Sequence, residues 1–259
     1  MSASAKAQAL EALIEAHATE LKLPTVKRRF RALAAETTRE QQAPIAYLAA
    51  LLDAEHQERA ERRERRRLID ARFPIIKTLQ EFRFDDNPKI PQATIAALAD
   101  GSWIDAREQV ILHGESGSGK THLATALAVC ACRQGRRVRF TTLAALANEL
   151  QEAESRRELG RVVGRYARTE LVCLDELGYL ALPDGAAELV FQVISERNER
   201  GSLIVTTNLP FGEWTKVFAD PRLAKAVVDR ITHKAHIIDT GTESWRFRHG
   251  LQRQGRKLA

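Results

Sequence analysis

The sequence predicts an α/β fold, in which a parallel β-sheet is covered by helices and preceded by a small all-helical domain. From residue 109 onward, short apolar runs alternate with helical patterns, which is typical of a parallel sheet with helices on both faces. A glycine-rich loop joins the first apolar run to the first helical pattern. Residues 1–73, by contrast, show a helical spacing of apolar residues throughout.

Residues 1–75 are predicted to form a helical domain that binds a partner or DNA. The first helix covers roughly residues 5–20, and Pro24 and Pro44 suit the first turns of two more helices. The third helix ends in a charged half in which arginines outnumber acids, namely Arg59, Arg62, Arg63, Arg65, Arg66 and Arg67. This half is either a solvated helix with pairs such as Glu58 and Arg62, or a basic ridge for DNA or a partner.

Residues 76–108 are predicted to be a linker that lies against the second domain, which covers residues 109–259. The linker contains Pro88, Pro91 and a polar cluster at 85–87, with one short helix near 92–100. Beyond the first strand we expect strands at 138–142, 171–174, 203–207 and 236–239, and helices at 143–168 (broken near Gly160), 186–200 and 221–232.

The most informative motif is the phosphate-binding loop that follows the apolar run 110–112. It fits the pattern G-x-x-x-x-G-K-[ST] at every fixed position, between a strand and a helix. Glycines let backbone N–H groups turn toward a phosphate, and the start of the next helix adds its positive dipole end. The residues expected around the nucleotide are Gly114, Glu115, Ser116, Gly117, Ser118, Gly119, Lys120, Thr121 and His122. Lys120 is expected to reach the phosphates and Thr121 to ligate Mg²⁺; the alternative is a chance glycine-rich turn.

Two further strand ends carry polar residues that suit nucleotide hydrolysis. Asp175 and Glu176 follow the apolar run 171–174, where Asp175 is expected to hold Mg²⁺ and Glu176 to polarise an attacking water. Asn208 follows the run 203–207 and is expected to bond the water or the γ-phosphate. The alternatives are a solvated acidic strand end and a turn residue before Pro210.

The predicted helix 221–232 carries Arg222 and Arg230 two turns apart. An arginine that reaches a neighbouring subunit's γ-phosphate would offset the charge that develops during hydrolysis. Alternatively, the two arginines pair with Asp220 and Asp229.

The composition is that of a soluble protein of a reducing cytoplasm. Hydrophobic residues make up 44% and charged residues 29% of the 259 residues. No apolar run approaches the ~20 residues that span a bilayer, and the N-terminus lacks the features of a signal peptide. The three cysteines, Cys130, Cys132 and Cys173, lie in apolar segments and support neither a disulfide framework nor a zinc site.

The charge is unevenly distributed. The net charge is +6, and residues 246–259 contain five basic residues and no acid. Such a segment suits a polyanion, most often a nucleic acid, or else forms a solvated tail that aids solubility.

The motifs together resemble AAA+ ATPases of the initiator and helicase-loader group, and more specifically the IstB-like transposition helper ATPases, which are kin to the DnaC loaders. The strings that carry the resemblance are GESGSGKTHLA (114–124), LVCLDELGY (171–179), LIVTTNLPFGEW (203–214), LAKAVVDRITH (223–233) and ESWR (243–246), with LKLPTVKRRF, YLAALLDAE and ARFPIIKTLQEFRF in the N-terminal half. The resemblance implies a five-stranded parallel sheet of order 5-1-4-3-2. It also implies ATP and Mg²⁺ as ligands, a homo-oligomer on duplex DNA and a partner transposase.

The resemblance also assigns roles. Lys120 and Thr121 hold the nucleotide, Asp175 and Glu176 serve the metal and the water, and Asn208 is a sensor. Arg230 matches the inter-subunit arginine finger. Arg246 matches a second sensor, although the family's string is closer to S-Y-R than to the S-W-R found here.

In this group, an extra helix between the second and third strands contacts DNA, and residues 143–168 fit it by position. Its basic residues are Arg156, Arg157, Arg161, Arg165 and Arg168, which alternatively pair with Glu154 and Glu158. Two other functions compete: a helicase loader that binds single-stranded DNA, and a small-molecule kinase. The kinase is disfavoured because no arginine-rich lid lies between the fourth and fifth strands.

Overall fold

The computed structural model describes residues 3–183 and 185–242. Its contacts divide the chain into two compact units, Met1–Arg66 and Arg67–Ala259, so that the division falls within the third helix rather than near residue 75. Each unit is described by itself. Arg246 and the basic segment 246–259 lie outside the described residues.

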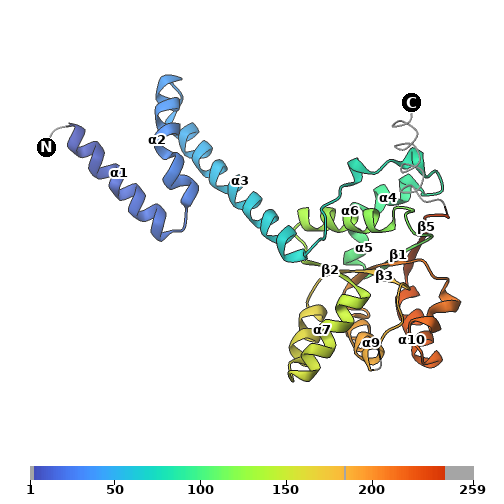
Figure 1. Cartoon of the computed structure of the whole chain (residues 1–259). Helices are drawn as coiled ribbons and strands as arrows, with labels where there is room; N and C mark the ends of the chain where they lie inside the picture. The colour runs from blue at the N-terminus through green and yellow to red at the C-terminus, as the bar shows by residue number, and fades with distance from the viewer. Residues whose placement is uncertain (1–2, 184, 243–259) are drawn as a thin grey trace, which may run out of the picture. The chain divides into compact units, whose positions relative to one another are not determined.

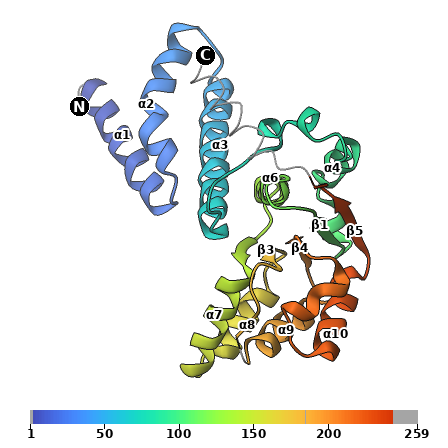
Figure 2. The ribbon, with the colours of Figure 1, turned by 45° about the vertical axis from the view of Figure 1, so that its right-hand side comes forward.

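The first unit contains three helices: α1 (Ala3–Glu20), α2 (Pro24–Arg39) and the first part of α3 (Pro44–Ala71). Helix α2 lies between α1 and α3 (Figure 1, Figure 2). Pro24 and Pro44 begin α2 and α3, as the sequence predicts. Proline suits this position because it lacks a backbone N–H, and the N–H groups of a helix's first turn have no partner within the helix. The core of this unit is small and consists of Ala18, Val26, Phe30 and Leu51.

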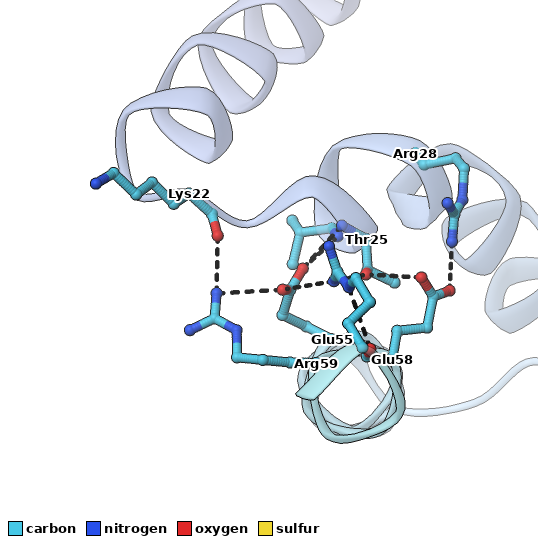
Figure 3. Close-up of polar contacts among 8 residues, drawn as sticks. Lys22, Thr25, Arg28, Glu55, Glu58 and Arg59 are labelled. Atoms are coloured by element: carbon cyan, nitrogen blue, oxygen red, sulfur yellow. Dashed lines mark hydrogen bonds and ion pairs between the residues drawn. The ribbon is translucent and has the colours of Figure 1, made fainter. Parts of the chain in front are cut away.

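A buried carboxylate from α3 caps the start of α2 (Figure 3). Leu23 precedes α2 and provides no side-chain cap. Glu55 replaces that cap, since its Oε2 accepts the backbone N–H groups of Thr25 at 2.8 Å and Val26 at 3.2 Å. Arg59 bridges the Glu55 carboxylate and the Lys22 carbonyl. Burial raises the pKa of Glu55, but these hydrogen bonds outweigh burial, and the pKa is lowered overall.

Several arginines of the charged half of α3 are used in packing. Arg62 donates to Thr25 Oγ1 and to the Glu58 carbonyl, while the Glu58 carboxylate bonds Arg28 instead (Figure 3). Within the second unit, Arg67 donates to the carbonyl of Cys132 at 2.7 Å. Arg62 and Arg67 thus each bond within their own unit, and the basic ridge for DNA or a partner stays a prediction.

The second unit is built on a five-stranded sheet in which every pairing is parallel. The strands are β1 (Gln109–His113), β2 (Val138–Thr142), β3 (Leu171–Leu177), β4 (Ser202–Thr207) and β5 (Ala235–Asp239). Their order is β2-β3-β4-β1-β5, which confirms the predicted order 5-1-4-3-2 in the reverse direction. The carboxyl ends of β1, β3 and β4 are therefore neighbours.

Helices cover both faces of the sheet (Figure 1). One face carries α7 (Leu143–Ser155), α8 (Leu159–Ala167), α9 (Ala186–Arg197) and α10 (Pro221–Thr232), whose core includes Leu150, Val190 and Trp214. The other face carries α4 (Gln92–Leu98), α5 (Ser102–Asp105) and α6 (Lys120–Arg133), whose core includes Ile95, Trp103 and Leu123. Short 3-10 turns lie at Leu79–Glu81, Phe84–Asp86 and Phe211–Lys216.

The largest differences from the predicted strand and helix bounds are in β3 and α9. Strand β3 continues through Asp175 and Glu176 to Leu177, with a register shift against β4 between Leu174 and Leu177. Helix α9 ends at Arg197, and the Arg197 side chain turns inward and becomes buried. Across the described residues, no helix combines the length and apolar character that crossing a membrane requires.

Candidate nucleotide-binding site

The phosphate-binding loop connects β1 to α6, as predicted, and two of its glycines have no room for a side chain. A Cβ at Gly114 (φ 148°) would lie 2.3 Å from Thr240 Oγ1. A Cβ at Gly119 (φ 100°) would lie 2.8 Å from the ring of Phe82. Both glycines also adopt positive φ, which other residues rarely do. The loop path therefore depends on glycine at these positions.

The loop opens into a cavity of about 1190 Å³. The predicted site residues that line it are Ser116, Gly117, Ser118, Gly119, Lys120, Thr121, His122, Asp175, Glu176 and Asn208. Residues from three strand ends and the loop thus meet at one place, although they are spread over nearly a hundred positions of sequence.

Lys120 turns back into the loop. Its Nζ donates to the carbonyls of Gly114 at 2.6 Å and Glu115 at 2.7 Å. The Lys120 ammonium group therefore lies where a loop of this kind surrounds a phosphate. A phosphate bound there would give the ammonium group charged acceptors in place of the two neutral carbonyls.

The loop is supported from β5. Ser118 Oγ lies 2.6 Å from Thr240 Oγ1, which also donates to the His113 carbonyl at 2.9 Å. The Glu115 N–H donates to the Gly241 carbonyl at 3.0 Å. These bonds hold the start of the loop against the sheet.

Thr121 and Asp175 form an oxygen-rich pair that fits a divalent cation. Thr121 Oγ1 lies 3.0 Å and 3.2 Å from the two carboxylate oxygens of Asp175. Asp175 is only 4% exposed. A hydroxyl and a carboxylate are hard oxygen ligands, and Mg²⁺ is commonly held by one or two such groups together with phosphates.

Glu176 and Asn208 both line the cavity. Glu176 is exposed and has a φ of 61°, so its backbone is in the left-handed region. Asn208 Oδ1 is buried and has no hydrogen-bond partner within the described chain. The Glu176 carboxylate and Asn208 Oδ1 can each accept a hydrogen bond from a water molecule in the cavity, whereas the Asn208 Nδ2 group can donate to a phosphate.

Residues 78–87, predicted to be part of a linker, also reach the site. His122 Nε2 lies 2.9 Å from the Thr78 carbonyl, and the His122 ring packs edge-on against Phe82. Asn87 Nδ2 donates to the carbonyls of Thr240 at 2.7 Å and Ser118 at 3.4 Å. Sequence reasoning missed these residues; the aromatic pair in the string EFRF was the available signal.

Tyr179 is a second residue that sequence reasoning missed. Its hydroxyl lies 3.1 Å from Ser116 Oγ, so the segment after β3 contacts the phosphate-binding loop. Nothing in the local pattern indicates this contact, because the two residues are 63 positions apart.

Arg230 is not brought into the cavity of its own chain. It lies on α10, its guanidinium stacks over the ring of Phe191 at 4.5 Å, and its Nη1 donates to the Ala226 carbonyl. The residues that line the cavity in the described part of the chain do not include it. Asp220 accepts the backbone N–H of Arg222 and caps α10, so its role is capping and not pairing with the Arg222 side chain.

The arginines of α8 and its flanks are mostly engaged with nearby acids. Arg156 pairs with Glu152 at 2.6 Å, and Arg161 pairs with Glu158 at 2.5 Å. Arg165 pairs with Glu149, which also accepts the Tyr166 hydroxyl, both at 2.7 Å. Burial raises the pKa of Glu149, but these bonds outweigh it and lower the pKa overall. Arg157 and Arg168 remain predicted DNA contacts along with the others.

The chain is similar to known ATP-binding proteins of insertion sequences. The family model described as IstB-like ATP binding protein matches residues 16–253. An insertion-sequence ATP-binding protein of Sinorhizobium fredii is 37% identical over 90% of this chain and 78% of its own length. The ATP-binding protein of insertion sequence IS5376 from Geobacillus stearothermophilus is 32% identical over 91% of this chain and 94% of its own.

A solved structure shares the fold. The structure of AMPPCP-bound DnaA from Aquifex aeolicus superposes with a TM-score of 0.55 at 16% sequence identity. The match covers 69% of this chain and 54% of that one. At this identity, the likeness concerns the fold alone.

Proposed function

The chain belongs to the family of IstB-like ATP binding proteins, and from this premise we propose that it is an ATPase that assembles on duplex DNA and assists a partner transposase. One observation carries the proposal: Lys120, Thr121, Asp175, Glu176 and Asn208 line one cavity, whereas Arg230 lies outside it. Such a site holds a nucleotide within one chain, while Arg230, outside it, serves a nucleotide held by another copy.

Different residues of the chain serve different parts of the hydrolysis reaction. Lys120 and the backbone of the phosphate-binding loop bind the phosphates. Glu176 polarises the attacking water, and Asn208 orients that water or the terminal phosphate. Thr121 and Asp175 would hold Mg²⁺, which when bound neutralises charge on the phosphates.

A further cation is supplied by a second copy. Arg230 of one subunit reaches the nucleotide of its neighbour, so that hydrolysis depends on assembly. The net charge of +6 favours a nucleic acid as the surface on which copies gather. The transposase is proposed as partner because the relatives are named as ATP-binding proteins of insertion sequences.

The proposal is tested by measuring duplex-DNA binding and ATP hydrolysis together. We expect the wild type to bind fluorescent duplex DNA in the presence of Mg-ATP and to hydrolyse ATP faster when DNA is present. Binding should weaken as salt rises, because neutralised phosphates release counterions.

Lys120→Ala is the decisive variant, and Lys216→Ala is its control. Loss of the Lys120 ammonium should weaken ATP binding by roughly 30-fold or more and remove ATP-dependent DNA binding. Lys216 is exposed and pairs with Glu213, so its loss should change neither property. A wild type that binds no Mg-ATP in calorimetry, or whose DNA binding ignores ATP, would contradict the proposed function.

A further inference from the structure

One buried hydroxyl, that of Thr206 on β4, lies between the two acidic residues of β3. Thr206 is 2% exposed. Its Oγ1 donates to Asp175 Oδ1 at 2.5 Å and accepts the backbone N–H of Glu176 at 3.0 Å. A hydroxyl makes both bonds at once because it has one proton to donate and lone pairs to accept with. The metal-binding carboxylate and the backbone of the water-polarising residue are thus joined through one side chain.

The bond to Glu176 replaces a regular strand contact. Leu174 is paired with Val205, but the next pair is Leu177 with Thr207, so one residue more of β3 than of β4 lies between the two pairs. At this irregularity Glu176 adopts a φ of 61°. A left-handed backbone at a residue other than glycine is unfavourable and persists only where its surroundings fix it. The Thr206 hydroxyl is one such constraint, since it holds the Glu176 N–H.

The bond to Asp175 fixes the carboxylate beside Thr121. Asp175 Oδ1 accepts hydrogen bonds from both Thr121 and Thr206. Thr121 is also expected to ligate the cation, whereas the Thr206 hydroxyl donates its proton to the carboxylate alone. Hydrogen bonds of this kind to a metal-binding carboxylate set its orientation.

We propose that Thr206 is a positioning residue of the ATPase site: its hydroxyl orients Asp175 toward the cation and holds the β3 bulge that presents Glu176. The inference rests on the proposed ATPase function and adds a residue that acts through two others. The competing role is structural, in which the hydroxyl merely satisfies polar groups in a buried place.

The two roles are separated by the Mg²⁺ dependence of nucleotide binding. In the full chain, Thr206→Val removes the hydroxyl at nearly constant volume, and Thr206→Ser restores it. Thr169→Val is the matched control, because it removes a hydroxyl that bonds the Arg165 carbonyl just before β3 begins. For each variant, the affinity for a fluorescent ATP analogue is measured with and without Mg²⁺, together with kcat, KM and the melting temperature.

In Thr206→Val, we expect the gain in affinity that Mg²⁺ provides to fall about 10- to 100-fold, with a similar loss in kcat. Affinity without Mg²⁺ should be unchanged. Thr206→Ser and Thr169→Val should resemble the wild type. If Thr206→Val does not fold, Thr206→Ala replaces it, since the smaller side chain cannot clash and lacks the same hydroxyl.

Two results would overturn the inference. One is a Thr206→Val protein with wild-type Mg²⁺ dependence and kcat. The other is a loss of affinity that is equal with and without Mg²⁺, which indicates only a structural role. Failure of the proposed function is a different outcome, because it appears in the wild type as an absence of Mg-ATP binding.

Discussion

At the scale of single residues, Arg197 is a buried cation that donates to four backbone carbonyls. It is 1% exposed and donates to the carbonyls of Tyr166, Thr169, Glu170 and Ser202. These carbonyls lie where α8 leads into β3 and where β4 begins. Burial lowers the pKa of Arg197 to about 10, so the guanidinium still carries its charge at neutral pH. The Arg197 side chain therefore links the segment between α8 and β3 to the start of β4.

Replacing Arg197 by methionine should be strongly destabilising, because it leaves several buried carbonyls without donors. We expect the free energy of unfolding to fall by about 3 kcal/mol or more, measured by urea denaturation. Arg200→Met is the control: Arg200 is exposed and pairs with Glu196 at 3.0 Å, so its loss should cost less than about 1 kcal/mol. Equal costs for the two variants would show that the carbonyls find other donors.

The sequence predicts some site residues better than others, and the reason is distance along the chain. Gly114 to Thr121 are consecutive, so their chemistry is visible in one motif. The role of Thr206 cannot be predicted from its place at a strand end, because its bonds reach about thirty residues back to Asp175 and Glu176. Such contacts follow from strand order, which a local pattern does not contain.

At the scale of elements, α2 depends on α3 for its beginning. Its first N–H groups point to Glu55, a residue of another helix, and not to a cap of its own. An unpaired helix start leaves several N–H groups without acceptors. The stability of α2 is therefore tied to the ionisation of one carboxylate.

Glu55→Gln should loosen α2 in a pH-dependent way. At pH 7 we expect a loss of about 1–2 kcal/mol, seen as faster hydrogen exchange of α2 amides. The pKa of Glu55 is lowered by folding, so its contribution is present above the unfolded pKa and is lost as pH falls through the folded pKa. The difference between wild type and variant should thus shrink on acidification below about pH 4.

The control for this effect is Glu61→Gln. Glu61 lies on α3 and is exposed. Its replacement should leave exchange of α2 unchanged at both pH values. A difference between wild type and Glu55→Gln that stays constant from pH 7 to pH 3 would show that the charge of Glu55 does not support the helix.

Helix starts could be predicted from proline, as at Pro24, Pro44 and Pro221. Strand ends could not be predicted where tertiary contacts accept a polar residue into a strand. Strand β3 continues through Asp175 because hydroxyls of α6 and β4 bond the carboxylate there. The prolines of residues 76–108 likewise favour a linker, although this segment contains side chains such as Ile95 and Trp103 that are buried against the sheet.

At the scale of the whole molecule, alternation of strands and helices predicts a parallel sheet but not its order. The order followed from the resemblance to AAA+ ATPases and is confirmed. That order has a functional consequence, because β1, β3 and β4 are adjacent and their carboxyl ends form one cavity, while α10 and Arg230 lie apart from it. Because Arg230 does not line the cavity of its own chain, we expect it to act on the nucleotide of a second copy.

Cooperation between chains can be tested by mixing two inactive variants. Arg230→Ala should bind ATP like the wild type, because Arg230 does not line its own cavity, but its DNA-stimulated turnover should fall by about 10³. Lys120→Ala should fail to bind ATP yet still present Arg230. A mixture of the two should regain measurable turnover, since the Lys120→Ala subunit supplies the arginine to the nucleotide held by the Arg230→Ala subunit. Lys225→Ala, an exposed change on the same helix, should behave as wild type. The contrary result is that Arg230→Ala alone hydrolyses ATP at the wild-type rate and that mixing it with Lys120→Ala adds no activity. In that case Arg230 is not the inter-subunit arginine finger.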